Sequence, residues 1–139
     1  MKLKSAIPVT CALIEYEGKV LIAQRSAQQE RGGYWEFPGG KLEAGEEETG
    51  GLKREIQEEL EVRVKPVTKL PEVVYQYPDK TIRLMPWRCI LTKGGIPKPV
   101  EHVQVLWVEP QALMQYTLSN ADIEVARHYL RFLSNQTDE

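Results

Sequence analysis

The stretch GGKLEAGEEETGGLKREIQEELEV, at residues 39–62, carries more structural information than any other part of this chain. Eight carboxylates fall between Glu43 and Glu61, which is dense even for a surface segment. The second half of the stretch, residues 52–62, predicts an amphipathic helix, because apolar side chains recur there at intervals of four and therefore share one face. These apolar residues are Leu52, Ile56 and Leu60.

Three carboxylates, Glu55, Glu58 and Glu59, gather on the sector next to that apolar face. Like charges three or four residues apart cost about 0.2–0.5 kcal/mol per pair on a bare helix, so something should offset the repulsion. A divalent cation is the simplest candidate, since Mg²⁺ and Mn²⁺ prefer carboxylate oxygens. The alternative is a solvated acidic face. The helical wheel places the remaining polar residues toward solvent: Lys53, Arg54, Gln57 and Glu61.

The spacing within the stretch is specific: Gly40, five residues, Glu46, seven residues, and then REIQEELEV at residues 54–62. This pattern resembles the signature of the Nudix hydrolases. One position departs from it, because Glu61 stands where the family has glycine. That glycine belongs to the helix exit, where it eases a left-handed turn. The substitution therefore bears on the geometry of the turn and leaves the expected metal ligands unchanged.

The rest of the chain reads as strands mixed with two further helices. Strands are expected at residues 7–16, 19–25, 67–77, 81–92 and 102–108, a short helix at 110–115 and a final helix at 122–133. Residues 93–99 read as a loop, and Pro86 predicts a bulge or a stretch of sheet edge. This order indicates an α/β or α+β fold with a mixed sheet between helices. The Nudix resemblance implies the same α/β/α sandwich, as a single domain over residues 1–139.

Two local features concern the start of the helix and the loop before it. Gly50 and Gly51 lie where the helix should begin, so we expect it to start late, with Thr49 as a possible N-cap. Trp35 and Phe37 flank Glu36 in the loop WEFPGGK, which resembles the corresponding stretch of MutT-like members. A nucleobase stacked on one of these aromatic rings is possible, whereas packing in the core is the expected fate of at least one.

The resemblance implies roles for particular residues. The metal ligands would be the Gly39 carbonyl and the carboxylates Glu55, Glu58, Glu59 and Glu101. Arg54 and Glu46 would be the pair that orients those carboxylates, and either Glu55 or Glu58 the general base. Substrate contacts would come from Arg25, Glu36 and Lys41, and from either Asp122 or Asn120 before the last helix. His102, beside Glu101, is expected to be structural or to lie at the surface.

Composition limits the kinds of partner. The formal net charge is −2, which argues against a domain that grips nucleic acid. No secretory signal and no apolar run of membrane length is visible, so we expect a cytoplasmic protein. We expect it to be a monomer or a homodimer. Cys11 and Cys89 lie in apolar runs and are expected to be buried and reduced.

These observations predict an Mg²⁺- or Mn²⁺-dependent nucleoside triphosphate pyrophosphohydrolase, with a (d)CTP-like pyrimidine triphosphate or 8-oxo-dGTP as substrate. Two alternatives stay open. One is hydrolysis of another nucleoside diphosphate derivative, such as a nucleotide sugar or a dinucleoside polyphosphate. The other is a Nudix-fold module that binds a nucleotide without turnover, although such modules tend to have lost the ligating glutamates that this chain retains.

Overall fold

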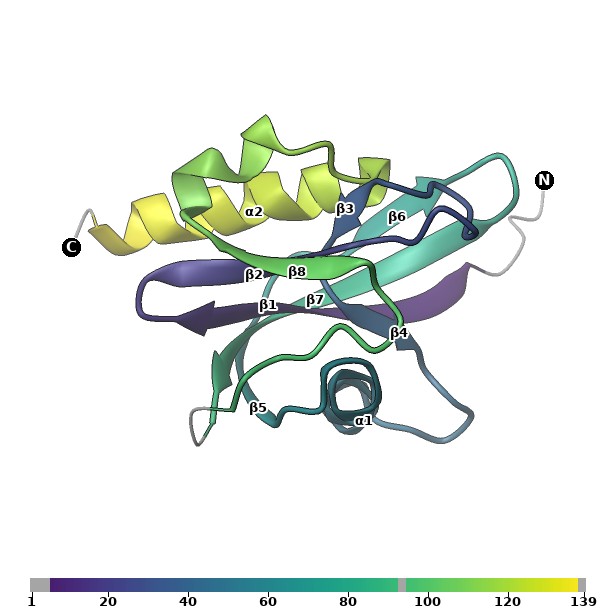
Figure 1. Ribbon diagram of the computed structural model, residues 1–139, viewed down its shortest axis with the longest axis horizontal. Helices are drawn as coiled ribbons and strands as arrows, with labels where there is room; N and C mark the ends of the chain where they lie inside the picture. Colours follow the sequence, from purple (N-terminus) through teal and green to yellow (C-terminus); the bar gives the residue numbers. More distant parts are fainter. Residues whose placement is uncertain (1–5, 93–94, 138–139) are drawn as a thin grey trace.

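In the computed structural model, which describes residues 6–92 and 95–137, a mixed β-sheet lies between helices α1 and α2 (Figure 1). Helix α1 covers one face of the sheet and α2 the other, so the predicted α/β/α sandwich is confirmed. Within the described ranges, no helix is long and apolar enough to cross a membrane.

The described strands are β1 Ile7–Tyr16, β2 Lys19–Gln24, β3 Trp35–Glu36, β4 Gly39–Lys41, β5 Val64–Lys69, β6 Val73–Gln76, β7 Thr81–Leu91 and β8 Gln104–Val108. The helices are α1 Glu48–Leu60, a 3₁₀ helix η1 Pro110–Gln115, and α2 Asn120–Thr137. The loop expected at 93–99 begins with residues 93–94, which lie outside the described residues.

Strand β1 organises the sheet. It pairs in parallel with β7 along nearly its whole length, from Ile7 opposite Ile82 to Glu15 opposite Ile90. Its other edge is divided, because β2 pairs with it only near Tyr16 while β4 pairs with it around Thr10. Strand β2 then continues between β3 and β8. The two halves of the sheet therefore diverge on this edge of β1.

The alternation of side chains along the central strands gives each face of the sheet its own core. On the α1 face, Ala12, Ile14 and Leu21 pack with the helix side chains Leu52, Ile56 and Leu60, all fully buried. The apolar helix face expected from the sequence is thus confirmed. On the α2 face, a larger cluster contains Leu13, Val20, Ile22, Val125 and Tyr129.

One predicted strand was wrong. Residues 67–77 do not form a single strand but belong to β5 and β6, which pair with successive parts of β7. Pro71 lies in the break, where a residue without an N–H cannot extend the ladder. The N–H of Leu70 donates to the Pro86 carbonyl at 2.9 Å. Pro86 itself pairs in register with Cys11 of β1. It lies where the other neighbour of β7 changes from β6 to β5, and this change of partner stands where a bulge or sheet edge was expected.

The expected N-cap at Thr49 was also wrong, because α1 starts at Glu48 and its capping position is Glu47, without a side-chain capping bond. The glycine pair lies inside the first turn of the helix. A Cβ on Gly51 would lie 2.4 Å from a methyl group of Leu42 and 2.9 Å from a carboxylate oxygen of Glu46. Gly51 thus permits close packing of the helix on the preceding loop, whereas a Cβ on Gly50 would meet open space.

At its other end α1 stops at Glu61, which adopts the left-handed conformation (φ 57°, ψ 36°) and donates its N–H to the Gln57 carbonyl. The turn that the family signature assigns to glycine is therefore made here by a residue with a side chain. A left-handed backbone costs an L-residue about 1–2 kcal/mol, and only glycine escapes that cost.

We predict that Glu61→Gly raises the free energy of unfolding by about 0.5–1 kcal/mol, since relief of the left-handed backbone exceeds the extra entropy of glycine in the unfolded chain. Urea denaturation measures the change. Lys53→Gly, at an exposed position in the right-handed body of the same helix, is the matched control and should lower stability by about 1 kcal/mol. A destabilised Glu61→Gly protein would contradict this account of the turn.

Candidate active site

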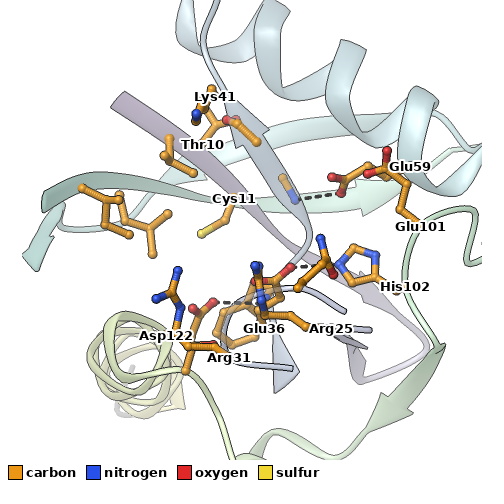
Figure 2. A pocket seen from close by; sticks show the side chains of 18 of the residues that line it. Thr10, Cys11, Arg25, Arg31, Glu36, Lys41, Glu59, Glu101, His102 and Asp122 are labelled. Atoms are coloured by element: carbon orange, nitrogen blue, oxygen red, sulfur yellow. Dashed lines mark hydrogen bonds and ion pairs between the residues drawn. The ribbon is translucent and has the colours of Figure 1, made fainter. Parts of the chain in front are cut away.

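The three helix carboxylates occupy different environments on α1. Glu55 is 17% exposed and lies against β4, so close that a Cβ on Gly40 would be 2.3 Å from its carboxylate. Glu58 is 60% exposed at the rim. Glu59 turns inward and accepts a hydrogen bond from the Gly39 N–H at 3.3 Å. Of these three carboxylates, Glu59 is the one that lines the cavity, where Figure 2 shows it.

Arg54 links this face to the loop before the helix. Its guanidinium forms a bidentate pair with Glu46, at 2.6 Å from Nε to Oε2 and 2.9 Å from Nη2 to Oε1. Its Nη1 donates to Glu55 at 3.1 Å and to Glu58 at 3.2 Å. The hydrogen bonds from Arg54 and from the Glu43 N–H lower the pKa of Glu46 to about 2. The expectation that Arg54 faces solvent was wrong, because its long side chain folds back over the carboxylates.

The pKa of the Glu59 carboxyl is strongly raised. Burial, followed by the negative charges of Glu36, Glu55 and Glu101, raises its pKa to about 8, and the Gly39 hydrogen bond opposes the shift. The charges that add to burial come from separate parts of the chain, because Glu36 and Glu101 line the same cavity as Glu59. Such crowding is what a divalent cation offsets.

Glu101 reaches this place through a loop that caps the end of α1. The N–H groups of Lys98 and Val100 donate to the helix carbonyls of Leu60 and Glu59, at 2.9 and 3.1 Å. These bonds satisfy two terminal carbonyls of the helix. They also place Glu101 beside Glu59 at the cavity wall, as Figure 2 shows.

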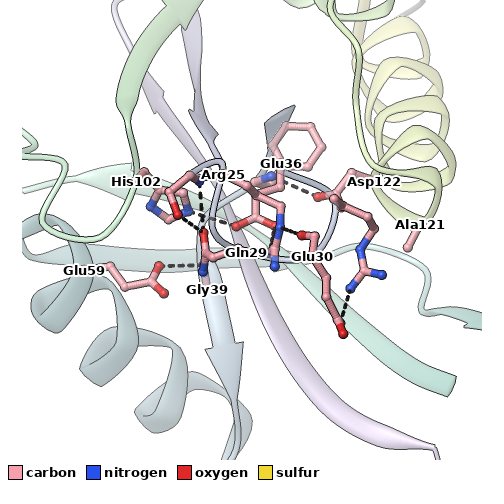
Figure 3. A network of polar contacts seen from close by, with 12 residues as sticks. Arg25, Gln29, Glu30, Glu36, Gly39, Glu59, His102, Ala121 and Asp122 are labelled. Atoms are coloured by element: carbon pink, nitrogen blue, oxygen red, sulfur yellow. Dashed lines mark hydrogen bonds and ion pairs between the residues drawn. The ribbon is translucent and has the colours of Figure 1, made fainter. Parts of the chain in front are cut away.

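Glu36 is held between two nitrogen-bearing side chains (Figure 3). Arg25 Nη1 donates to one carboxylate oxygen at 2.9 Å, and His102 Nε2 lies 2.9 Å from the other. Burial raises the pKa of Glu36, but the His102 hydrogen bond and the Arg25 charge outweigh it and hold the pKa below its usual range. Both oxygens of Glu36 are thus engaged within the protein, and Arg25 also donates to the Glu30 carbonyl at 2.8 Å.

At the other end of the cavity, α2 begins at Asn120, two residues earlier than expected. Asp122 is therefore in the first turn, and its carboxylate accepts the Phe37 N–H at 2.9 Å across the cavity wall. Burial, followed by the Glu36 charge, raises the pKa of Asp122 well above its usual value. Asn120 instead donates to the Tyr75 hydroxyl at 2.7 Å, outside this cavity. Of the two expected alternatives, Asp122 is the one that lines it.

Both aromatic side chains of the loop WEFPGGK are buried. Trp35 is 8% exposed and packs edge-on against Tyr116, whereas Phe37 is 3% exposed and forms part of the cavity lining. Stacking of a base on Trp35 is thus blocked by the core. Lys41, which ends β4, is exposed at the cavity mouth.

Sequence reasoning missed several cavity residues that carry no motif: Thr10, Cys11, Arg31, Tyr77 and Ser119. Their side chains meet only because β1, β6–β7 and α2 converge here. Cys11 and Cys89 are buried and unpaired with each other, and burial raises both thiol pKa values, that of Cys89 to about 12. Neither has the environment of a reactive thiolate.

The carboxylates fit a hard divalent cation by donor chemistry and by their crowding. As the side chains stand within residues 6–92 and 95–137, no three acidic, histidine or cysteine side chains converge tightly enough to hold one ion. Arg54 holds Glu55 and Glu58 by single hydrogen bonds of 3.1 and 3.2 Å. If Glu55 and Glu58 were to hold one ion together with Glu59, their side chains would have to rotate away from Arg54.

Comparison with known proteins agrees with the fold and the acidic cavity. A family model described as a NUDIX domain matches residues 9–128, and the chain belongs to the Nudix family. A CTP pyrophosphohydrolase of Escherichia coli is 34% identical over 124 residues, covering 89% of this chain and 91% of that protein. An 8-oxo-dGTP diphosphatase of Proteus vulgaris is 43% identical over 83 residues, covering 60% and 71%.

Solved structures show the same relationship. The solution structure of the E. coli ORF135 protein superimposes with a TM-score of 0.83 at 31% identity, covering 96% of this chain and 95% of that one. A MutT protein from Methanosarcina mazei has the same fold, with a TM-score of 0.81 at 24% identity. Hydrolases of this family use divalent metal ions, in keeping with the hard oxygen donors of the cavity.

Proposed function

We propose that this protein is a nucleoside triphosphate pyrophosphohydrolase of the cytoplasmic nucleotide pool, dependent on Mg²⁺ or Mn²⁺. The observation that carries the proposal is the polarity of the cavity. Glu59 and Glu101 converge at one end, and Asp122 closes the other. A molecule with a charged phosphate chain and a polar base matches that arrangement. The names of the two curated relatives add support, and point to (d)CTP or 8-oxo-dGTP as candidate substrates.

In this proposal Glu55, Glu58, Glu59, Glu101 and the Gly39 carbonyl hold the cation. The Gly39 N–H faces Glu59, and in a strand the carbonyl of a residue points to the same side as its N–H, away from β1. Bound divalent ions would neutralise phosphate charge and acidify water. Arg54 and Glu46 act as positioning residues. Their ion pair fixes the Arg54 guanidinium, which in turn holds the side chains of Glu55 and Glu58 by hydrogen bonds.

The reaction needs one water molecule and one proton acceptor. Water attacks an internal phosphorus, the bridging P–O bond breaks, and the products are a nucleoside monophosphate and pyrophosphate. Either Glu55 or Glu58 accepts the proton from water. Lys41, exposed at the cavity mouth, is placed to contact the phosphate chain. Glu36 and Arg25 line the cavity and contact the substrate in this proposal, since the Glu36 carboxylate keeps acceptor sites beyond its bonds to Arg25 and His102.

Assay of the purified protein against a panel of canonical and 8-oxo nucleoside triphosphates, nucleotide sugars and dinucleoside polyphosphates tests the function. We expect pyrophosphate release from one or two triphosphates, abolished by EDTA and restored by Mg²⁺ or Mn²⁺. Hydrolysis of nucleotide sugars alone would replace the proposal with the first alternative. Nucleotide binding without turnover of any compound would identify a recognition module.

Glu58→Gln should lower kcat at least 100-fold while the protein stays folded, since the substitution removes a charge needed by either a metal ligand or a general base. Steady-state kinetics measures the loss, and circular dichroism verifies the fold. Glu61→Gln removes the same charge just beyond the helix and should leave kcat within about twofold. Parent-level turnover by the Glu58→Gln protein would refute this placement of the site.

Gly40→Ala should weaken Mn²⁺ binding and turnover by about tenfold or more, because the new Cβ would occupy the position of the Glu55 carboxylate, 2.3 Å away. Titration of Mn²⁺ followed by electron paramagnetic resonance measures the affinity. Gly50→Ala is the matched control, since its Cβ meets nothing within 4 Å. It should stabilise α1 by up to about 1 kcal/mol and leave metal affinity unchanged. Equal Mn²⁺ affinity in both variants would remove Glu55 from the ligand set.

A further inference from the structure

The hydroxyl of Ser119 is a buried polar group with no partner among the described residues. The residue is 3% exposed, its Oγ has no hydrogen bond, and its side chain lines the cavity. Most buried side-chain hydroxyls in folded proteins are paired, because an unpaired one loses its bonds to water without replacement. An unpaired hydroxyl on a residue that lines a cavity points to a ligand that supplies the missing bond.

The usual role of a serine at this place in a chain is taken by another residue. Ser119 directly precedes α2, where a serine hydroxyl commonly caps the first free N–H groups of the helix. Here the Ala121 N–H donates to the Tyr77 hydroxyl at 2.9 Å. Tyr77 comes from the turn between β6 and β7 and thus caps the helix in trans. The Ser119 hydroxyl therefore has no capping bond to the helix.

The backbone of Ser119 is fixed, so its hydroxyl is held in place. Its N–H donates to the Trp35 carbonyl at 2.9 Å, and the Trp35 N–H donates to the Thr117 carbonyl at 2.8 Å. The Ser119 carbonyl accepts the Ile123 N–H at 3.0 Å as the first turn of α2 begins. A group ordered before its ligand arrives loses little entropy on binding.

Asp122 stands three residues further on, in the first turn of the same helix. One of its oxygens accepts the Phe37 N–H, and the same carboxyl lines the cavity in Figure 2. Glu59 and Glu101 lie at the opposite end. A phosphate chain held at the carboxylate end directs the base toward the end where Ser119 and Asp122 lie.

We propose that Ser119 is a specificity-determining residue whose hydroxyl binds a polar atom on the edge of the nucleobase, beside the atom that Asp122 contacts. The inference rests on the proposed function, because it requires a nucleoside triphosphate in this cavity. A serine hydroxyl donates and accepts, so together with a carboxyl group it matches two adjacent polar atoms of a base. A base without a polar atom at that place would leave the hydroxyl unpaired and bind less well.

Ser119→Ala tests the inference against a panel of nucleoside triphosphates. We expect kcat/KM for the preferred base to fall about tenfold or more, and kcat/KM for the poorest measurable base to change less than twofold. The affinity for a non-hydrolysable analogue of the preferred nucleotide should fall by the same factor. The thermal midpoint should be unchanged or higher, since the variant removes an unpaired buried group.

Two further variants sharpen the test. Ser119→Thr keeps the hydroxyl and should recover base discrimination, even if the added methyl group raises KM for every base. Thr49→Ala removes a hydroxyl in α1, outside the cavity lining, and should leave all rates unchanged. If kcat/KM of the Ser119→Ala protein fell equally for every base, or did not fall at all, the base contact would be overturned. The proposed function would still stand in that case, provided that the parent protein hydrolyses a nucleoside triphosphate. A parent that hydrolyses no nucleoside triphosphate would overturn both.

Discussion

The structure of the site depends on how closely α1 approaches the loop and strand that precede it. Gly40 has no Cβ, so the Glu55 carboxylate rests against its backbone, and the Gly39 N–H donates to Glu59. Gly51 allows Leu42 and Glu46 to pack against the first turn of the helix. A side chain at Gly39 would collide with the β1 backbone, with Cβ 2.0 Å from the Thr10 carbonyl oxygen. Helix, loop and sheet are thus in contact at backbone distance.

Helix α2 is held to the sheet by different contacts. Tyr129 of α2 donates its hydroxyl to Glu15 of β1 at 2.7 Å, and Arg88 of β7 forms a bidentate pair with the same carboxylate at 2.7 and 3.0 Å. The helix start is tied to β3 through the bridge between Trp35 and Leu118. The two ends of the cavity are therefore anchored independently, one by α1 and one by α2, with β1 common to both.

Two carboxyl groups in this cavity have pKa values shifted in opposite directions by their neighbours. Glu36 and Glu59 are both withdrawn from solvent, yet the pKa of Glu36 lies below its usual range while that of Glu59 rises to about 8. The difference arises because Arg25 and His102 contact Glu36, whereas Glu59 faces other acidic groups and one backbone N–H. Each oxygen of Glu36 thus has one partner within the protein. Glu59 has a deficit of positive charge, which a metal–nucleotide complex would correct.

The sequence by itself determined the parts that rest on local periodicity. The apolar face of α1 and the grouping of Glu55, Glu58 and Glu59 follow from a repeat of 3.6 residues, and the layered α/β/α class follows from the order of elements. The strand boundaries were less accurate: Pro71 divides a segment that the residue pattern read as continuous. The left-handed backbone of Glu61 at the end of α1 is likewise seen only in the structure, since glycine is the residue that usually takes this conformation after a helix.

Only the tertiary structure decided which distant residues meet. His102 lies 66 positions from Glu36 and Asp122 lies 85 positions from Phe37, so no short-range pattern links either pair. The Tyr77 hydroxyl caps α2 from the turn between β6 and β7, and Ser119, which directly precedes the helix, lines the cavity. Local spacing encodes a helix or a strand, whereas the pairing of strands from distant parts of the chain, such as β2 with β3 and β8, sets these long-range contacts. The acidic helix could therefore be predicted from the sequence, whereas at the far wall of the cavity the sequence predicted Asp122 only as one of two alternatives.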